Sequence, residues 1–238
     1  MSDLLASSQT CAHDATTPYA AVPGTRVRLL TETSKMPGPS WSLPAHKACP
    51  RANGTICDSC YASKGAYRYR TTRNAQDVRF AWTVESMRIP AGRGAWIECM
   101  VSAIRDTGCK YFRVHDSGDM FNAAYATAWL EVCRAMPEVR FWIPTRAWQQ
   151  PAGPLPLFDP LLGILRQLAQ LPNVTVRPSA LNFGDHAPGV AGLHAGSTAG
   201  MPDVFRARQC PAYAQGGQCG DCRACWDSKD TPISYRKH

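Results

Sequence analysis

Seven of the eleven cysteines fall into two short groups, and this grouping constrains the chain more than any other feature. The first group has the spacing C-x7-C-x2-C, and the second has the spacing C-x8-C-x2-C-x2-C. Closely spaced thiolates converge on a single inorganic centre, and thiolate is the usual ligand of iron–sulfur clusters and structural zinc. We therefore expect two separate metal centres, with these ligands: Cys49, Cys57 and Cys60 in the first; Cys210, Cys219, Cys222 and Cys225 in the second.

The spacing of the second group favours a [4Fe–4S] cluster, because a C-x2-C-x2-C run with a fourth cysteine is typical of ferredoxins. Zinc is the alternative, although zinc sites more often use two separated C-x2-C pairs. Four thiolates close a site, whereas three leave one metal position open for a substrate or cofactor. His46 could instead complete the first group as a zinc site with three thiolates and one imidazole.

The net charge of +8 and the pI near 9.0 favour acidic partners, with nucleic acid or a nucleotide first. The first residues lack the basic and apolar regions of a signal peptide, and no apolar window is long enough for a membrane span. We therefore expect a cytoplasmic protein without a membrane partner. Its thiols should stay reduced, and an odd cysteine total argues against a complete disulfide framework.

Apolar periodicity predicts an alternation of strands and helices, which is typical of a parallel sheet. The strands are expected at 26–32, 110–115, 139–144 and 173–178, and helices at 95–107, 122–136 and 160–171, with an earlier one from about Asn74. A full barrel takes about 250 residues, so we expect an α/β fold with a partial or reduced (β/α) barrel. The expected divisions are a loose arm at 1–24, the barrel at 25–205 with an irregular loop at 182–205, and a C-terminal iron–sulfur module at 206–238.

Polar side chains follow three of these predicted strands. They are His115, Asp116, Ser117, Gly118 and Asp119 after the first; Thr145 and Arg146 after the second; Arg177 and Ser179 at the end of the third. Ligands of parallel α/β sheets bind at the carboxyl ends of the strands, so these residues should face one cavity. We expect His115, Asp116 and Asp119 to be catalytic. The alternative is that they are ordinary turn and cap residues.

The three-cysteine group followed by these strand ends resembles the radical S-adenosylmethionine (SAM) enzymes. That resemblance implies a [4Fe–4S] cluster on Cys49, Cys57 and Cys60 whose open iron binds SAM, and a reductant for the cluster. It also implies that the turn Ser117-Gly118-Asp119 holds the SAM amino group. The other expected cofactor-binding residues are Arg146, Arg177 and Ser179, with the arginines as clamps for an anionic group. The spacing departs from the C-x3-C-x2-C usual in that superfamily.

Several motifs are similar to those of the phage gene product 88 family. They are KMPGPSWSLPAHKACP, CDSCYA, FRVHDSGDMFN, FWIPTR, VRPSAL and CGDCRACW, and together they span about residues 30–238. This resemblance implies a phage protein that works in the host cytoplasm.

These observations together favour a radical SAM-type enzyme with two [4Fe–4S] clusters that modifies nucleic acid or a nucleotide. One alternative is a zinc-dependent base-exchange enzyme, because the HDSGD turn resembles the Asp-Ser-Gly turn of tRNA-guanine transglycosylases. In that case Asp116 or Asp119 would be the nucleophile or the general acid/base. The other alternative is a nucleic-acid-binding phage protein whose metals only stabilise the fold.

Overall fold

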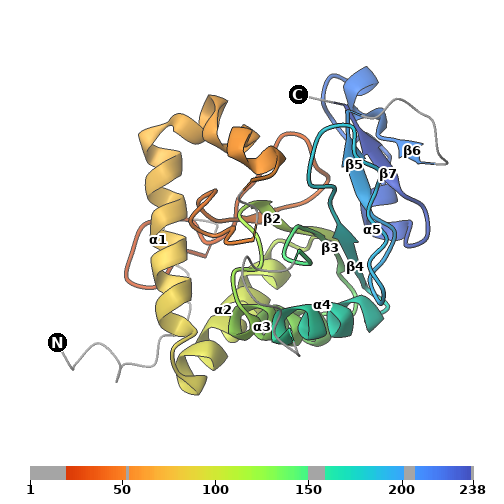
Figure 1. Cartoon of the computed structure of the whole chain (residues 1–238). Coiled ribbons are helices and arrows are strands. Elements are labelled where there is room, and N and C mark those ends of the chain that lie inside the picture. The colour runs from red at the N-terminus through yellow and green to blue at the C-terminus, as the bar shows by residue number, and fades with distance from the viewer. Residues whose placement is uncertain (1–19, 52–53, 150–158, 201–206, 237–238) are drawn as a thin grey trace.

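A computed structural model of the chain describes residues 20–51, 54–149, 159–200 and 207–236. Its main sheet has four parallel strands that lie side by side in chain order (Figure 1). They are β1 (Ser40–Ser42), β2 (Tyr111–Ser117), β3 (Arg140–Thr145) and β4 (Val174–Pro178). The prediction of an α/β fold with a parallel sheet is confirmed. Among the described residues the sheet is open, and no barrel is formed.

Four helices lie between β1 and β4 in the chain. They are α1 (Arg70–Ser86), α2 (Pro90–Asp106), α3 (Ala123–Ala135) and α4 (Pro160–Gln170). In Figure 1, α2, α3 and α4 cover one face of the sheet, below it, and α1 stands at its left. Side chains alternate between the two faces of a strand, so every second residue of β2, β3 and β4 points at these helices. Phe112, Phe141 and Val176 are such residues, and they are buried in the main core.

The periodic elements are confirmed from the second predicted strand onward, to within a few residues. The first predicted strand, 26–32, is wrong. That stretch makes only single antiparallel bridges at Arg28 and Thr31, and β1 follows it instead. The three residues of β1 are a tryptophan between two buried serines, which carries no apolar alternation. The connection from β1 to α1 contains three short 3-10 helices, η2 (Ile56–Ser59), η3 (Tyr61–Ser63) and η4 (Gly65–Arg68).

The C-terminal residues lie on the other face of the main sheet. A second parallel sheet has the order β5 (Ser197–Ala199), β7 (Ile233–Tyr235) and β6 (Arg208–Gln209). The 3-10 helix η5 (Pro211–Gln215) and the short helix α5 (Ala224–Asp227) lie between β6 and β7. The presence of β5 corrects the prediction that 182–205 is irregular throughout; the part of that loop at 201–205 lies outside the described residues.

Trp226 of α5 attaches this C-terminal segment to the main sheet. Its indole N–H donates to the carbonyl of Phe112 in β2 at 2.9 Å, and its ring lies 5.2 Å from that of Trp142 in β3. Both rings are buried in a small second core. The segment that carries the second cysteine group is therefore packed on the sheet rather than tethered beside it.

The predicted arm at 1–24 lies mostly outside the described residues, but its last part is packed. Ala20 and Val22 are buried in the main core, and the backbone N–H of Val22 donates to the carbonyl of Val27 at 2.8 Å. No helix in the described part of the chain is long and apolar enough to cross a bilayer.

Candidate functional site

The loop that carries the first cysteine group crosses the carboxyl ends of the main strands. The carbonyl of Ala48 accepts from the backbone N–H of Asp119, just after β2, at 3.0 Å. The N–H of Ile56 donates to the carbonyl of Leu181, beyond β4, at 2.7 Å. The loop therefore lies where ligands of parallel α/β sheets bind.

Arg51 anchors the middle of the same loop beyond β3. Its guanidinium donates to the carbonyl of Ala147 at 2.9 Å and pairs with both carboxylate oxygens of Asp159. Asp159 is also the N-cap of α4, where one of its oxygens accepts from the N–H of Leu161. The Arg51 hydrogen bond lowers the pKa of the Asp159 carboxyl, which favours its charged form. This two-pronged geometry fixes the loop more firmly than a single contact would.

The thiols of the first group lie within electrostatic reach of one another. Burial raises the pKa of Cys49 well above its usual range, and the charges of Asp119, Cys57 and Cys60 raise it further. Burial also raises the pKa of Cys60, while nearby Arg146 and Lys64 lower it. A cationic centre would therefore be needed to hold Cys49 as a thiolate at neutral pH.

The second cysteine group gathers around α5, β6 and η5. Burial raises the pKa of Cys225 to about 11, and the charges of Cys210 and Cys219 act on it in the same direction. The Cys225 sulfur lies 3.2 Å from the hydroxyl oxygen of Tyr235. The backbone N–H of Cys219 donates to the carbonyl of Lys35 at 2.8 Å, which ties this group to the loop before β1.

The donor type of both groups fits an iron–sulfur cluster or zinc, because each contains at least three cysteines. Their side chains are not arranged as ligands around one metal ion. Among the described residues, no three Cys, His, Asp or Glu side chains lie close enough together to hold a metal ion. The His46 imidazole, the predicted alternative zinc ligand, lies 3.2 Å from the Ser63 hydroxyl.

Asp119 joins the ends of β2 and β3 through its carboxylate. One oxygen accepts from the Thr145 hydroxyl at 2.6 Å and from the N–H of Met120 at 2.7 Å. The other accepts from the N–H of Arg146 at 2.7 Å. Burial raises the pKa of this carboxyl, and the hydrogen bond from Thr145 opposes that rise. The structure thus brings Asp119, Thr145 and Arg146 together as predicted, with the carboxylate already holding three donors.

Ser117 and Gly118 lie in a tight contact with the first cysteine loop. The Ser117 hydroxyl donates to the carbonyl of Leu43, and it accepts from the Gln76 amide at 3.2 Å. Gly118 has a φ of +92°, and a Cβ built there would lie 2.7 Å from the Cβ of Leu43. Ser179, at the end of β4, receives a hydrogen bond from the Ser197 hydroxyl at 3.3 Å. These contacts hold the strand ends together.

His115 was predicted to be catalytic, and its position corrects that prediction. Its side chain points into the layer between β2 and α3, where Nε2 lies 2.8 Å from the Tyr125 hydroxyl oxygen. Burial lowers the His115 pKa to about 3, and the charge of Arg113 adds to the effect. The imidazole is buried, with its Nδ1 unpaired among the described residues. A neutral ring that core side chains shield from solvent cannot contact or exchange a proton with a substrate at the strand ends.

Asp116 belongs to a polar cluster on the opposite face of β2. One carboxylate oxygen accepts from the Tyr67 hydroxyl at 2.6 Å, and the other lies 3.7 Å from Arg113. The Tyr61 hydroxyl donates to the Asp116 carbonyl. Arg113 also lies over the Trp142 ring, 4.7 Å from its centroid. We did not predict Arg113, Tyr61 or Tyr67, although the alternation of KYFRVH indicates that Arg113 lies opposite Phe112 and Val114.

Arg177 was predicted to clamp an anion, and the structure corrects this too. Its guanidinium is buried and donates to four backbone carbonyls. They are those of Ala195 at 2.6 Å, Gly196 at 3.2 Å, Thr231 at 3.0 Å and Ser228. Arg177 therefore links β4 to the C-terminal segment. Both terminal nitrogens of its guanidinium already donate to backbone carbonyls, so they are not free to bind a ligand. Arg146 differs, because only its Nε has a described acceptor, the Ala180 carbonyl at 3.0 Å.

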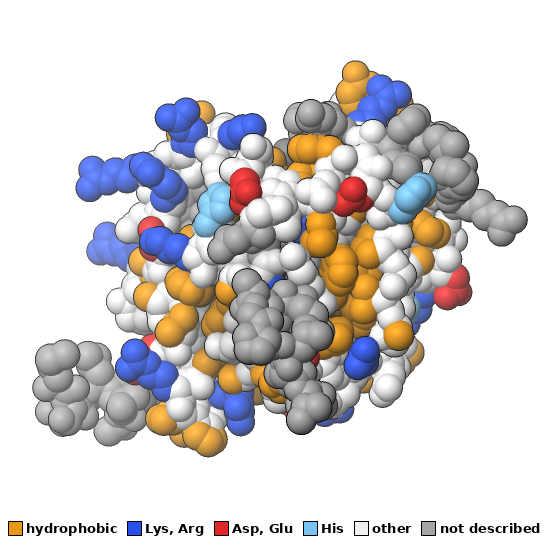
Figure 2. Space-filling view, in the orientation of Figure 1, with side chains coloured by type: hydrophobic (Ala, Val, Ile, Leu, Met, Phe, Trp, Pro, Cys, Tyr) orange, Lys and Arg blue, Asp and Glu red, His pale blue; other side chains and the backbone are white. Residues whose placement is uncertain are grey.

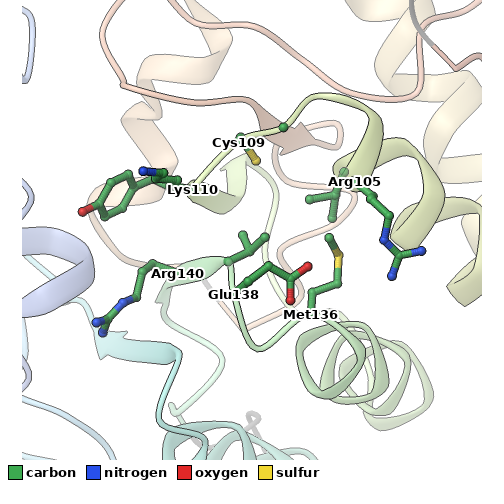
Figure 3. Close-up of a pocket in the computed structure, with 10 residues that line it drawn as sticks. Arg105, Cys109, Lys110, Met136, Glu138 and Arg140 are labelled. Atoms are coloured by element: carbon green, nitrogen blue, oxygen red, sulfur yellow. The ribbon is translucent and has the colours of Figure 1, made fainter.

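One cavity of about 440 Å³ lies at the other end of the main sheet, where β2 and β3 begin (Figure 3). Its lining includes Cys109, Met136 and Glu138, with Arg105, Lys110 and Arg140 also contributing. Cys109 is separate from both cysteine groups in the sequence. The predicted site at the carboxyl ends is thus distinct from this cavity.

The comparisons with known proteins agree with the motifs. The family described as "Gene product 88" matches residues 13–228. The "Gene 88 protein" of Mycobacterium phage L5 is 31% identical over 104 residues, which cover 42% of this chain and 43% of that relative. This chain therefore spans less than half the length of the relative in the match. No solved structure matches the chain. The protein belongs to the gene product 88 family of phage proteins.

Proposed function

We propose that the protein is an iron–sulfur enzyme of the radical SAM type that acts on nucleic acid or a nucleotide. Cys49, Cys57 and Cys60 would hold the catalytic cluster. Cys210, Cys219, Cys222 and Cys225 would hold an auxiliary one. When bound, a cluster with three protein thiolates supplies an open iron for SAM and the electron for its reductive cleavage.

The observation that carries this proposal is the course of the first cysteine loop. Hydrogen bonds of the Ala48 carbonyl, the Arg51 guanidinium and the Ile56 N–H attach this loop to the segments that follow the strands. The loop that carries the three cysteines thereby follows the carboxyl edge of a parallel sheet, where α/β enzymes bind their ligands. A metal that served only to stabilise the fold would not need this position.

Arg146 is the residue best placed to bind an anionic group beside the first centre. Its charge acts on Cys60, and its terminal nitrogens have no acceptor among the described residues. The carboxylate of SAM is a suitable partner for such a guanidinium. Asp119 would position Arg146 by accepting from its backbone N–H.

Asp116 is the carboxylate that remains for proton transfer. It lies with the Tyr67 hydroxyl and Arg113 on the face of β2 opposite the helices, and neither contact uses all of its acceptor sites. The zinc-dependent base-exchange alternative would use the same carboxylate as nucleophile or general base. Asp116→Asn therefore lowers turnover in both cases and does not separate them.

Binding of SAM separates the two cases. Protein purified without oxygen and loaded with iron and sulfide should give a cluster EPR signal that changes when SAM is added. With dithionite it should release 5′-deoxyadenosine. Cys57→Ala should abolish both effects, whereas Cys222→Ala should keep the SAM-dependent change. Failure of a fully iron-loaded sample to bind SAM at millimolar concentration would overturn the proposal.

A further inference from the structure

Four exposed cations surround η4 and the start of α1, and we call this surface the basic ridge: Lys64, Arg68, Arg70 and Arg73. None of the four forms an ion pair with another described residue. The sequence contains no acidic residue between Asp58 and Asp77, and Asp77 is paired with Lys47 at 2.7 Å. The positive charge of this surface is therefore not neutralised locally.

The backbone of α1 adds to the positive electrostatic potential of the basic ridge. The helix is 17 residues long, and its N-cap Tyr69 makes no side-chain capping hydrogen bond. The free N–H groups of the first turn and the helix dipole place partial positive charge beside Arg70 and Arg73. These two arginines are three positions apart and so share one side of the helix. Lys and Arg side chains gather over this region at the upper left of Figure 2.

Exposed tyrosines lie among the cations. Tyr69 is 67% exposed and Tyr61 is 47% exposed, and Tyr69 stands between Arg68 and Arg70 in the chain. Cations that follow a phosphate backbone, combined with aromatic rings that stack on bases, are typical of single-strand binding surfaces. A membrane-binding surface would instead carry aliphatic side chains that enter the bilayer.

The basic ridge begins where the first cysteine group ends. Cys60 immediately precedes η3, and the charge of Lys64 reaches the Cys60 thiol. We propose that the basic ridge binds the phosphates of single-stranded nucleic acid while Tyr69 stacks on a base. The strand would then be the substrate of the first centre, and this assignment rests on the proposed function. The binding itself does not require a cluster.

The test compares two triple variants with equal change in charge. Arg68→Gln/Arg70→Gln/Arg73→Gln removes three charges of the ridge. Arg105→Gln/Lys110→Gln/Arg140→Gln removes three at the rim of the cavity in Figure 3, at the far end of the sheet. Binding of fluorescent single-stranded DNA and RNA 12-mers is followed by anisotropy between 50 and 200 mM salt. Thermal melts by circular dichroism verify that each variant is folded, and single substitutions replace any triple variant that is not.

We expect the ridge variant to bind at least about ten-fold more weakly. Its log–log salt slope should fall by about 2, since each lost phosphate contact removes roughly 0.7 on a single strand. The cavity-rim variant should bind as wild type does. Equal losses in the two variants would show that net charge alone attracts the strand, and would overturn the proposal. Ridge-dependent binding to phosphatidylserine vesicles without oligonucleotide binding would also overturn it.

Tyr69 gives a second, uncharged test. Tyr69→Ala should weaken binding by roughly five-fold or more, because a stacked base is lost. Tyr69→Phe keeps the ring and should bind within about two-fold of wild type. Unchanged binding by Tyr69→Ala would exclude the stacking role. Cys57→Ala should bind the oligonucleotides normally, so a failure of the iron–sulfur proposal would be seen separately from a failure of this one.

Discussion

The Asp119 carboxylate accepts a hydrogen bond from the Thr145 hydroxyl at 2.6 Å, which joins the end of β2 to the end of β3. With the N–H groups of Met120 and Arg146 as further donors, Asp119 acts as a brace at the site. Asp119→Asn should lower the free energy of unfolding by about 1–3 kcal/mol, because one buried donor loses its acceptor. Urea unfolding measures this.

Thr145→Val is the matched variant for that brace. It removes the partner hydroxyl, and a double-mutant cycle with Asp119→Asn should give a coupling of about 0.5–3 kcal/mol. An Asp119→Asn variant that keeps wild-type stability but fails to bind SAM would contradict this structural role of Asp119. Such a result would instead support a direct contact between Asp119 and SAM, as the resemblance to radical SAM enzymes implies.

Gly118 is required by packing against the first cysteine loop. Gly118→Ala should cost at least about 2 kcal/mol of stability, because it combines a strained positive φ with a clash in the core. Gly24→Ala is the control, since Gly24 has a φ of +73° but open space around its Cα. Equal costs for the two variants would show that the contact with Leu43 is unimportant.

Arg177 is predicted to matter for folding. Arg177→Met should cost about 3 kcal/mol or more, because it leaves several buried carbonyls without a donor. Arg177→Lys should fail to restore stability, because a lysine cannot reproduce the guanidinium fork. Limited proteolysis should show earlier cleavage within 207–236 in both variants. A stable Arg177→Met protein with an intact C-terminal segment would contradict this role.

His115 should make the fold sensitive to mild acid. Its pKa is lowered to about 3 in the folded chain by burial and by Arg113, whereas an unfolded histidine titrates near 6.5. Between these values the unfolded state binds the extra proton, so stability falls as the pH drops below about 6.5.

From pH 7 to pH 5 this loss amounts to about 2 kcal/mol. Paired urea titrations should show that His115→Phe lacks this part of the pH dependence, whatever its stability at pH 7. The neighbouring groups Arg113, Asp116 and Tyr125 are unchanged in the variant. Identical pH dependence in wild type and variant would mean that His115 is not buried as a neutral ring.

Apolar periodicity predicted β2, α3, β3, α4 and β4, because each buries a regular set of large side chains. It could not predict β1. That strand is three residues long, and its serines are buried because of long-range partners: the Ser42 hydroxyl accepts from Gln76 at 2.9 Å. β1 pairs with β2, about 70 residues later in the chain, and this pairing produces no recognisable pattern in the sequence around β1.

The cysteine spacing predicts two metal centres, and this stays a prediction, because no three described Cys, His, Asp or Glu side chains lie close enough together to hold a metal ion. The roles of the charged strand-end residues were harder to predict. Arg146 and Arg177 look alike in sequence, each near the end of a strand. Only the position of the C-terminal segment decides that Arg177 faces carbonyls of 195–231. The face of β2 that carries Arg113 was predictable by alternation, whereas its Tyr67 and Asp116 neighbours depend on the course of the loop after Cys60.

The central claim is that two separate iron–sulfur centres exist, and metal and sulfide analysis of anaerobically purified protein tests it most directly. Wild type should contain about eight irons and eight sulfides per chain, as two four-iron clusters require. Cys57→Ala and Cys222→Ala should each contain about four of both. Stoichiometric zinc without sulfide, or a variant that keeps the full wild-type content, would contradict the account.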